Sequence, residues 1–289
     1  MSTTALTRTQ RVFAIIGGVV AIAAIIWLVY QVPAWLTRDV KEAEGFRTQL
    51  VQLIGFGIAG AVAVYGIKKH YLDRDKQYTD SYSAAVSKLG SADSFLRAGG
   101  ARELERIMDY TPADQIRVVE TYADFLRHHS ATSDRPDSAQ RPAADVTAVL
   151  AALRRRRVAA DEPTLDLSRI QVPNADMRGM RLPGADLSRS NLNGADLTDA
   201  TLTDADLTAT TFNRADLSNA RLCRAKLIDA RFVAATLRGA DLTGADMTGC
   251  ALKDADLRGA DLREVRGLTA EQLADARTDA TTRLPDHLA

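Results

Sequence analysis

A strict five-residue alternation of apolar and polar positions runs from Leu165 to Glu264. The central position is large and apolar in all twenty pentads, with fifteen Leu, two Phe, two Met and one Val. Two residues before it stands Ala in fourteen pentads, and the other three positions are polar or Gly almost throughout. A period of five fits neither an α-helix nor a β-strand, and an unbroken short repeat is typical of a solenoid.

The tripeptide Ala-Asp-Leu recurs in register within these pentads, at 185–187, 195–197, 215–217, 240–242 and 255–257 among others. The stretch resembles the pentapeptide-repeat family, whose motif is Ala, then Asp or Asn, then Leu and two variable residues. The resemblance implies a right-handed, four-sided β-helix with four pentads in each coil. Twenty pentads then make about five coils, which at ~4.8 Å per coil form a rod about 24 Å long. The central apolar side chains should fill its axis, with the Ala side chains at the inner corners.

Two apolar runs precede the repeat. Residues 12–30 carry no polar side chain except the terminal Tyr30 hydroxyl, and residues 50–67 are interrupted only by Gln52 and the Tyr65 hydroxyl. Each run is long enough to cross a bilayer core. The sequence therefore predicts a two-helix transmembrane hairpin within 12–69, after an N-terminal tail at 1–11.

The basic residues around these runs predict the orientation of the hairpin. Six Lys or Arg residues lie outside its two ends, and three lie in the loop between them. Because positive charge favours the cytoplasmic side, we expect both termini in the cytoplasm. The predicted location is the cell membrane, with two passes and direct contact with membrane lipid.

Residues 70–160 read as a small all-α module that contains a polar linker at 130–142. Its last helix is amphipathic and ends in four consecutive arginines at 154–157. These arginines suit a solvated helix C-terminus, where cations complement the dipole, or contact with anionic lipid headgroups. The stretch 85–107 resembles a helical pair in actinobacterial membrane-anchored pentapeptide-repeat proteins.

Both ends of a solenoid need a cover. The repeat domain spans 161–266, and a C-terminal cap at 267–289 follows it. Thr269 to Gln272 form a capping box that starts a short helix through Arg277, and Leu268 and Leu273 can cover the end of the core. At the other end, the helix at 143–159 is the candidate cover.

The composition and the motifs indicate no catalytic or metal-binding site. The 37 basic and 37 acidic residues balance, and the two cysteines, Cys223 and Cys250, occupy one outward and one inward position. None of the four histidines has a partner at metal-ligand spacing, and no phosphate-binding or nucleophile motif is present. We therefore expect no enzyme activity, catalytic residue, cofactor or metal.

The repeat is most irregular at its outward positions between 221 and 233. Cations replace the usual Asp in three successive pentads, and Ile228 and Val233 replace Ser or Thr. An exposed apolar patch among cations is a candidate partner site. The alternative is repeat drift, with apolar side chains lying against Arg stems. The candidate patch consists of Arg221, Cys223, Arg224, Lys226, Ile228, Arg231 and Val233.

Two functions are compatible with these features. The first is a non-enzymatic, membrane-tethered binding or scaffold protein that presents a rigid solenoid surface to a cytoplasmic protein. The second comes from another pentapeptide-repeat subgroup, whose acidic rods resemble B-form DNA and bind DNA gyrase. Fifteen acidic and thirteen basic residues between 165 and 264 give a net charge of −2. So small a charge mimics a phosphate backbone poorly, and a nucleic-acid partner is not expected either.

Overall fold

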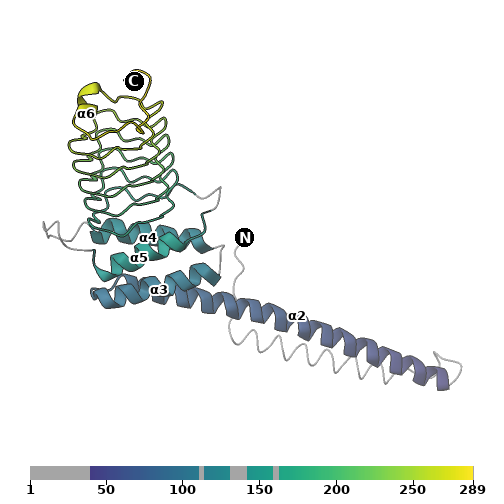
Figure 1. The fold of residues 1–289 in the computed structure, drawn as a ribbon. Helices are drawn as coiled ribbons and strands as arrows, with labels where there is room; N and C mark the ends of the chain where they lie inside the picture. The colour runs from purple at the N-terminus through teal and green to yellow at the C-terminus, as the bar shows by residue number, and fades with distance from the viewer. Residues whose placement is uncertain (1–39, 111–113, 131–141, 159–162, 289) are drawn as a thin grey trace, which may run out of the picture. The chain divides into compact units, whose positions relative to one another are not determined.

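The computed structural model of the protein describes residues 40–110, 114–130, 142–158 and 163–288. The chain divides into two compact units, Met1–Tyr78 and Thr79–Ala289. In the second unit, helices lie against one end of a stack of coils joined by short β-bridges (Figure 1). The predicted tail at 1–11, the first predicted span at 12–30 and all but the ends of the predicted linker lie outside the described residues.

Backbone pairing confirms the five-residue repeat and the arrangement of four pentads per coil. Parallel bridges join residues twenty apart, as in Asp186 with Asp206. In that pentad, the amides of Asp206, Leu207 and Ala209 donate to carbonyls of adjacent coils at 2.9, 2.8 and 2.8 Å. Because each inner coil is bonded on both sides, unpaired backbone edges remain only at the two ends of the stack.

The core of the solenoid follows the predicted inward positions. All twenty central side chains and the fourteen inward Ala residues are buried. Two inward positions are polar, and the hydroxyls of Ser190 and Thr210 donate to the carbonyls of Leu167 and Leu187 at 3.1 and 2.7 Å. Each fully buried Leu contributes roughly 1.5–3 kcal/mol relative to an exposed one, so the axis supplies most of the driving force for folding.

Every pentad ends in a residue with left-handed backbone, a feature that the repeat motif did not reveal. The φ angles at these twenty positions lie between 55° and 71°. Left-handed backbone costs an ordinary residue roughly 1–2 kcal/mol, whereas Gly adopts it freely. This explains why Gly, Asn and Asp fill thirteen of the twenty positions.

The described helices are α2 (Val40–Leu89), α3 (Ser94–Tyr110), α4 (Gln115–Ser130), α5 (Ala144–Arg155) and α6 (Ala270–Ala274). Helix α5 packs on both α3 and α4, and the shared core contains Leu104, Tyr122, Leu126, Leu150 and Leu153. Val146 and Val149 of the amphipathic helix α5 are buried, whereas Ile116 of α4 is 42% exposed.

The prediction of a transmembrane hairpin is wrong. Within the ranges that the structure describes, none of the helices has the length and apolar character that a membrane crossing requires. Residues 50–67 are an internal stretch of the fifty-residue helix α2, which contains Gln52 and continues directly into Lys68 and Lys69. The predicted multi-pass location in the cell membrane and the lipid contact rested on this hairpin and are withdrawn with it.

Arginines from α4 and from the C-cap of α5 cover the N-terminal edge of the solenoid. The Arg127 guanidinium donates to the Asp166 carbonyl at 2.8 Å, and that of Arg156 donates to the Arg181 carbonyl at 2.7 Å. Arg181 in turn donates to the Arg156 carbonyl at 2.8 Å. The first coil has no preceding coil to bond, so these donors satisfy carbonyls at its open edge. The cover from residues 143–159 was predicted from the sequence, whereas the contribution of α4 was not.

The four-arginine run is therefore largely occupied within the protein. Arg154 lies 3.3 Å from Asp176, Arg155 pairs with Glu105, and Arg156 is buried with 3% of its surface exposed. Lipid contact by this run was predicted together with the membrane hairpin and is withdrawn with it. The solvated helix end fits the exposed side chains of Arg155 and Arg157. The run joins α5 to both α3 and the solenoid.

The C-terminal segment covers the other end of the core. Thr269 and Gln272 form the predicted capping box at the start of α6, which ends at Ala274 rather than at Arg277. Arg277 instead pairs with Asp256 as a further β-bridge, which ends the helix early. Leu268 is buried, and Leu273 is partly buried against the same core.

Candidate functional site

The outer surface of the solenoid has four walls, each defined by the β-bridged column at its centre. Wall A carries Asp166, Asp186, Asp206, Lys226 and Asp246; wall B carries Gln171, Asn191, Thr211, Arg231 and Ala251. Wall C carries Asp176, Asp196, Asp216, Thr236 and Asp256; wall D carries Arg181, Thr201, Arg221, Asp241 and Asp261. The residue directly after each column residue is the inward central one. Each wall also includes the two turn residues that come after it, two and three positions beyond the column residue.

The Asp that recurs at the column position stabilises the turn that follows it. The carboxylates of Asp186, Asp206 and Asp216 each accept a hydrogen bond from the amide two residues later, at 2.8, 3.0 and 2.9 Å. This amide makes no bond between coils, so without the carboxylate it would lack a partner within the fold. The acidic columns on walls A and C therefore follow from turn chemistry and do not themselves indicate a catalytic site.

The seven residues of the candidate patch follow one path around the solenoid across three walls. Arg221, Cys223 and Arg224 lie on wall D, Lys226 and Ile228 on wall A, and Arg231 and Val233 on wall B. All seven are at least partly exposed. The structure thus keeps these residues outward, but it divides them among three faces instead of gathering them on one.

On wall D, two of the three patch residues, Cys223 and Arg224, are bonded to neighbouring carboxylates. Arg224 donates twice to Asp204 at 2.7 Å, and the Cys223 thiol donates to Asp241 at 2.8 Å. Burial, followed by the hydrogen bond to the Asp241 carboxylate, raises the pKa of the Cys223 thiol to about 11. A thiol held in its protonated form is a poor nucleophile.

On wall A, Lys226 lies 3.5 Å from Asp206 and interrupts a column that is otherwise acidic. Ile228 replaces the Ser or Thr that follows the column residue in the other four coils of this wall, and it is partly exposed. An apolar side chain therefore stands at a position that elsewhere carries a hydroxyl.

On wall B, an asparagine ladder supplies the hydrogen bonds that Asp supplies elsewhere. The Asn193 side-chain oxygen accepts from the Asn213 amide at 2.8 Å, and that of Asn213 accepts from the Val233 amide at 3.1 Å. Arg231 cannot accept a hydrogen bond, so the preceding coil provides the acceptor for its pentad. The five-residue motif leaves the turn positions variable, so this ladder could not be predicted from it.

A shallow groove runs along wall B. Its volume is about 520 Å³, and it is lined by Asn174, Asn193, Gly194, Asn213, Arg214, Arg231 and Val233. Two of these, Arg231 and Val233, belong to the candidate patch. The groove therefore places a cation and an apolar side chain of the patch beside a row of asparagines.

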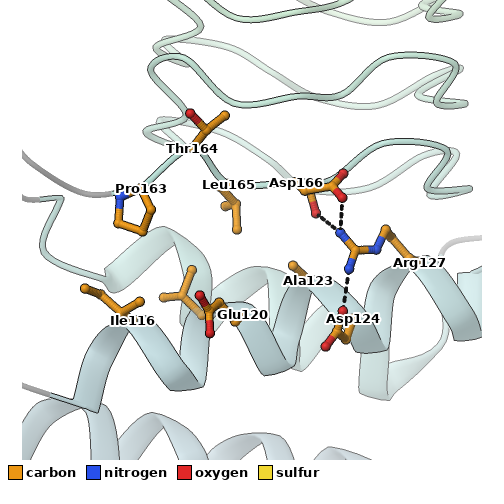
Figure 2. A pocket seen from close by; sticks show the side chains of 10 residues that line it. Ile116, Glu120, Ala123, Asp124, Arg127, Pro163, Thr164, Leu165 and Asp166 are labelled. Atoms are coloured by element: carbon orange, nitrogen blue, oxygen red, sulfur yellow. Dashed lines mark hydrogen bonds and ion pairs between the residues drawn. The ribbon is translucent and has the colours of Figure 1, made fainter.

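A second hollow, of about 320 Å³, lies between α4 and the first coil (Figure 2). Figure 2 shows the Arg127 guanidinium between Asp124 of α4 and Asp166 of the solenoid, and it bonds both. Arg127, the cation of this hollow, is thus paired with carboxylates of the protein itself. The contact joins α4 to the first coil of the solenoid.

Metal-binding chemistry has no candidate in the described part of the chain, where no three His, Cys, Asp or Glu side chains gather in a suitable group. His128 bonds the Asp124 carbonyl through Nδ1 at 2.8 Å, and His129 stacks on Phe125. This adjacent pair therefore contributes to the surface of α4.

Acidification is expected to destabilise the solenoid between about pH 5 and pH 2. Hydrogen bonds from Arg258 and Arg263 lower the pKa of Asp256 and of Asp261, respectively, to about 2. A carboxylate with a depressed folded-state pKa stabilises the fold above its unfolded pKa, about 3.9, and loses this contribution as pH falls toward the folded value. Chemical denaturation across this range measures the slope, which should be shallower in an Asp256→Asn, Asp261→Asn variant. An identical slope in that variant would contradict the assignment.

Comparisons with known proteins locate the similarity in the solenoid. Residues 166–262 match the family model described as a pentapeptide repeat region. None of the curated proteins compared with the chain matches it.

Three solved structures illustrate the likeness. Rfr23, a pentapeptide repeat protein from the cyanobacterium Cyanothece 51142, is 32% identical over 32% of this chain and 63% of its own, with a TM-score of 0.30. A pentapeptide repeat protein from the Arabidopsis thaliana thylakoid lumen is 32% identical over 34% of this chain and 68% of its own, with a TM-score of 0.33. QnrB1, a plasmid-mediated fluoroquinolone resistance protein, is 23% identical over 40% of this chain and 65% of its own, with a TM-score of 0.29. This chain therefore spans less than two thirds of the first of these structures.

Proposed function

We propose a function for this chain, which belongs to the pentapeptide-repeat family through residues 166–262. The protein is a non-enzymatic binding or scaffold protein whose solenoid binds a protein partner. The observation that carries the proposal is the rigid display of outward side chains. Every wall is held by hydrogen bonds between coils, so its side chains keep fixed spacing before a partner arrives. Preorganisation of this kind lowers the entropy lost on binding.

The contact surface proposed for the partner is the patch from Arg221 to Val233. Its members remain outward, and Ile228 and Val233 give it apolar area beside cations. Partly exposed apolar side chains gain free energy when a partner removes them from water, and buried anchors dominate interface energies. Because the patch crosses three walls, a partner that contacts all of it must wrap around the rod, whereas a partner at one edge contacts the patch residues of two walls.

The patch is tested with an Ile228→Asp, Val233→Asp variant of the chain. Both positions face outward, so the free energy of unfolding should stay within about 0.5 kcal/mol of the parent value. Recovery of crosslinked partner proteins, compared by mass spectrometry between variant and parent, should fall to background, because charge replaces apolar anchors.

The matched control is Asp186→Asn with Asp206→Asn, which removes charge from wall A. Asn keeps a side-chain oxygen that can accept from the turn amide, so folding should not change. Loss of partner recovery in the control pair alone would move the site to the acidic columns and favour the alternative, a DNA mimic that binds DNA gyrase. Marked unfolding of the Ile228, Val233 variant would show that these side chains carry the fold and not a partner.

A further inference from the structure

Wall B differs from the other walls in the sign of its charge. It carries three cations, Arg214, Arg231 and Lys253, and one carboxylate, Asp254. Walls A and C each carry five acidic and three basic residues, and wall D carries four of each. The solenoid as a whole is nearly neutral, so its positive potential is concentrated on this one wall.

The cations of wall B are also free of partners within the described residues. Arg214, Arg231 and Lys253 are exposed, and the structure gives none of their side chains an ion pair or a hydrogen bond. Elsewhere on the solenoid, Arg224 and Arg263 are each bonded to a carboxylate at 2.7 Å. Bringing a carboxylate to wall B would therefore form new charge-assisted hydrogen bonds without breaking internal ones.

The asparagines of wall B add further donors. The side-chain oxygens of Asn191, Asn193 and Asn213 all accept hydrogen bonds inside the fold. Within the described chain, the structure gives their side-chain nitrogens no acceptor. Since each amide group offers two N–H donors, the asparagines present donors to the outside, as the cations do.

We propose that wall B binds an extended acidic segment of a protein partner, with side-chain carboxylates on Arg214, Arg231 and Lys253 and backbone carbonyls on the asparagine ladder. This proposal rests on the proposed function, whose partner class it specifies. The three cations stand on three successive coils, ~4.8 Å apart along the axis. A strand that rises ~3.3 Å per residue places alternate side chains about 6.6 Å apart, so acidic residues at alternate positions can reach neighbouring cations.

The negative charge of the neighbouring walls favours an acidic peptide over a nucleic acid as the ligand of wall B. Wall B lies between walls A and C, whose columns each carry four Asp residues. A single strand of peptide fits within the positive stripe and the groove of about 520 Å³. A long polyphosphate chain would extend over the flanking carboxylates, which repel it, and three cations give it few counter-charges.

The test measures fluorescence anisotropy of a labelled peptide of alternating Glu and Ser residues with the full 289-residue chain. The chain should bind this peptide and should not bind the same peptide with Gln in place of Glu. An Arg214→Ala, Arg231→Ala variant should bind the acidic peptide at least about tenfold more weakly, because each lost cation removes charge-assisted hydrogen bonds.

The matched control is Arg189→Ala with Arg238→Ala, which removes two exposed cations from walls A and C. It should keep the parent affinity, and thermal melting should show that both variants fold. Equal weakening in both pairs, no binding of the acidic peptide by the parent chain, or tighter binding of a labelled single-stranded oligonucleotide would each overturn the proposal. If the peptide fails while crosslinked protein partners are still recovered, the inference on wall B falls and the proposed function stands.

Discussion

Replacing Leu207 by Lys is expected to unfold the central coils of the solenoid. Leu207 is completely buried on the axis, in a core of apolar side chains. The variant loses the packing of a buried Leu, worth roughly 2–5 kcal/mol, and places an ammonium group in an apolar environment. The total approaches the whole stability of a domain, about 5–15 kcal/mol. Hydrogen exchange should show that the amides of residues 185–224 lose their protection.

The matched control is the next residue, Thr208→Lys. Thr208 faces outward on wall A and follows Asp206, whose carboxylate accepts from its amide at 3.0 Å. Lys keeps that backbone amide and extends its charge into water, so exchange protection should remain near the parent level. Similar protection in both variants would show that the inward and outward positions have been assigned incorrectly.

Removing the Asp145 carboxylate is expected to destabilise the helices α3 to α5 by roughly 3–5 kcal/mol. Asp145 lies in the first turn of α5, has 1% of its surface exposed and forms an ion pair with Arg97 of α3. Arg97 also donates to the carbonyls of Ser91 and Ala92 at 2.9 and 2.8 Å. Asp145→Ala leaves a largely buried guanidinium without its counter-charge. The helical circular dichroism signal should be lost at a lower denaturant concentration.

Asp114→Ala serves as the comparison for this pair. Asp114 lies 3.7 Å from Arg117, whose side chain is 60% exposed, so water already solvates the cation. Ion pairs of this kind contribute roughly 0–1 kcal/mol, and the denaturation midpoint should barely move. A comparable loss in the two variants would mean that the burial of Asp145 has no energetic consequence.

The solenoid could be predicted because its periodicity fixes inward and outward positions without knowledge of distant contacts. Leu207, Phe212 and their equivalents are buried where the five-residue phase places them. The same local reasoning failed at 50–67, where an apolar run of sufficient length suggested a membrane span. The length and hydropathy of residues 50–67 are properties of that segment alone. In the structure, the helix continues on both sides of the segment, from Val40 to Leu89.

The candidate surface was predicted only in part. The outward character of Ile228 and Val233 follows from phase, and the structure agrees. The pairing of Arg224 with Asp204 and the asparagine ladder of wall B depend on residues twenty positions apart, which become neighbours only when coils stack. The four arginines at 154–157 illustrate the same limit, since their partners come from α3 and the first coil.

The sequence by itself determined the repeat, its phase, the buried axis and the capping box of α6, because these depend on patterns within a few residues. With four pentads per coil, the repeat also places residues twenty apart on one wall and so divides the charge among the walls. Only the tertiary structure decided which cations remain unpaired. It also decided that arginines of α4 and of the α5 C-cap close the first coil. Those features are set by distances between residues remote in the chain. Amino-acid composition alone does not reveal where the charges lie, so a nearly neutral rod can carry one distinctly positive wall.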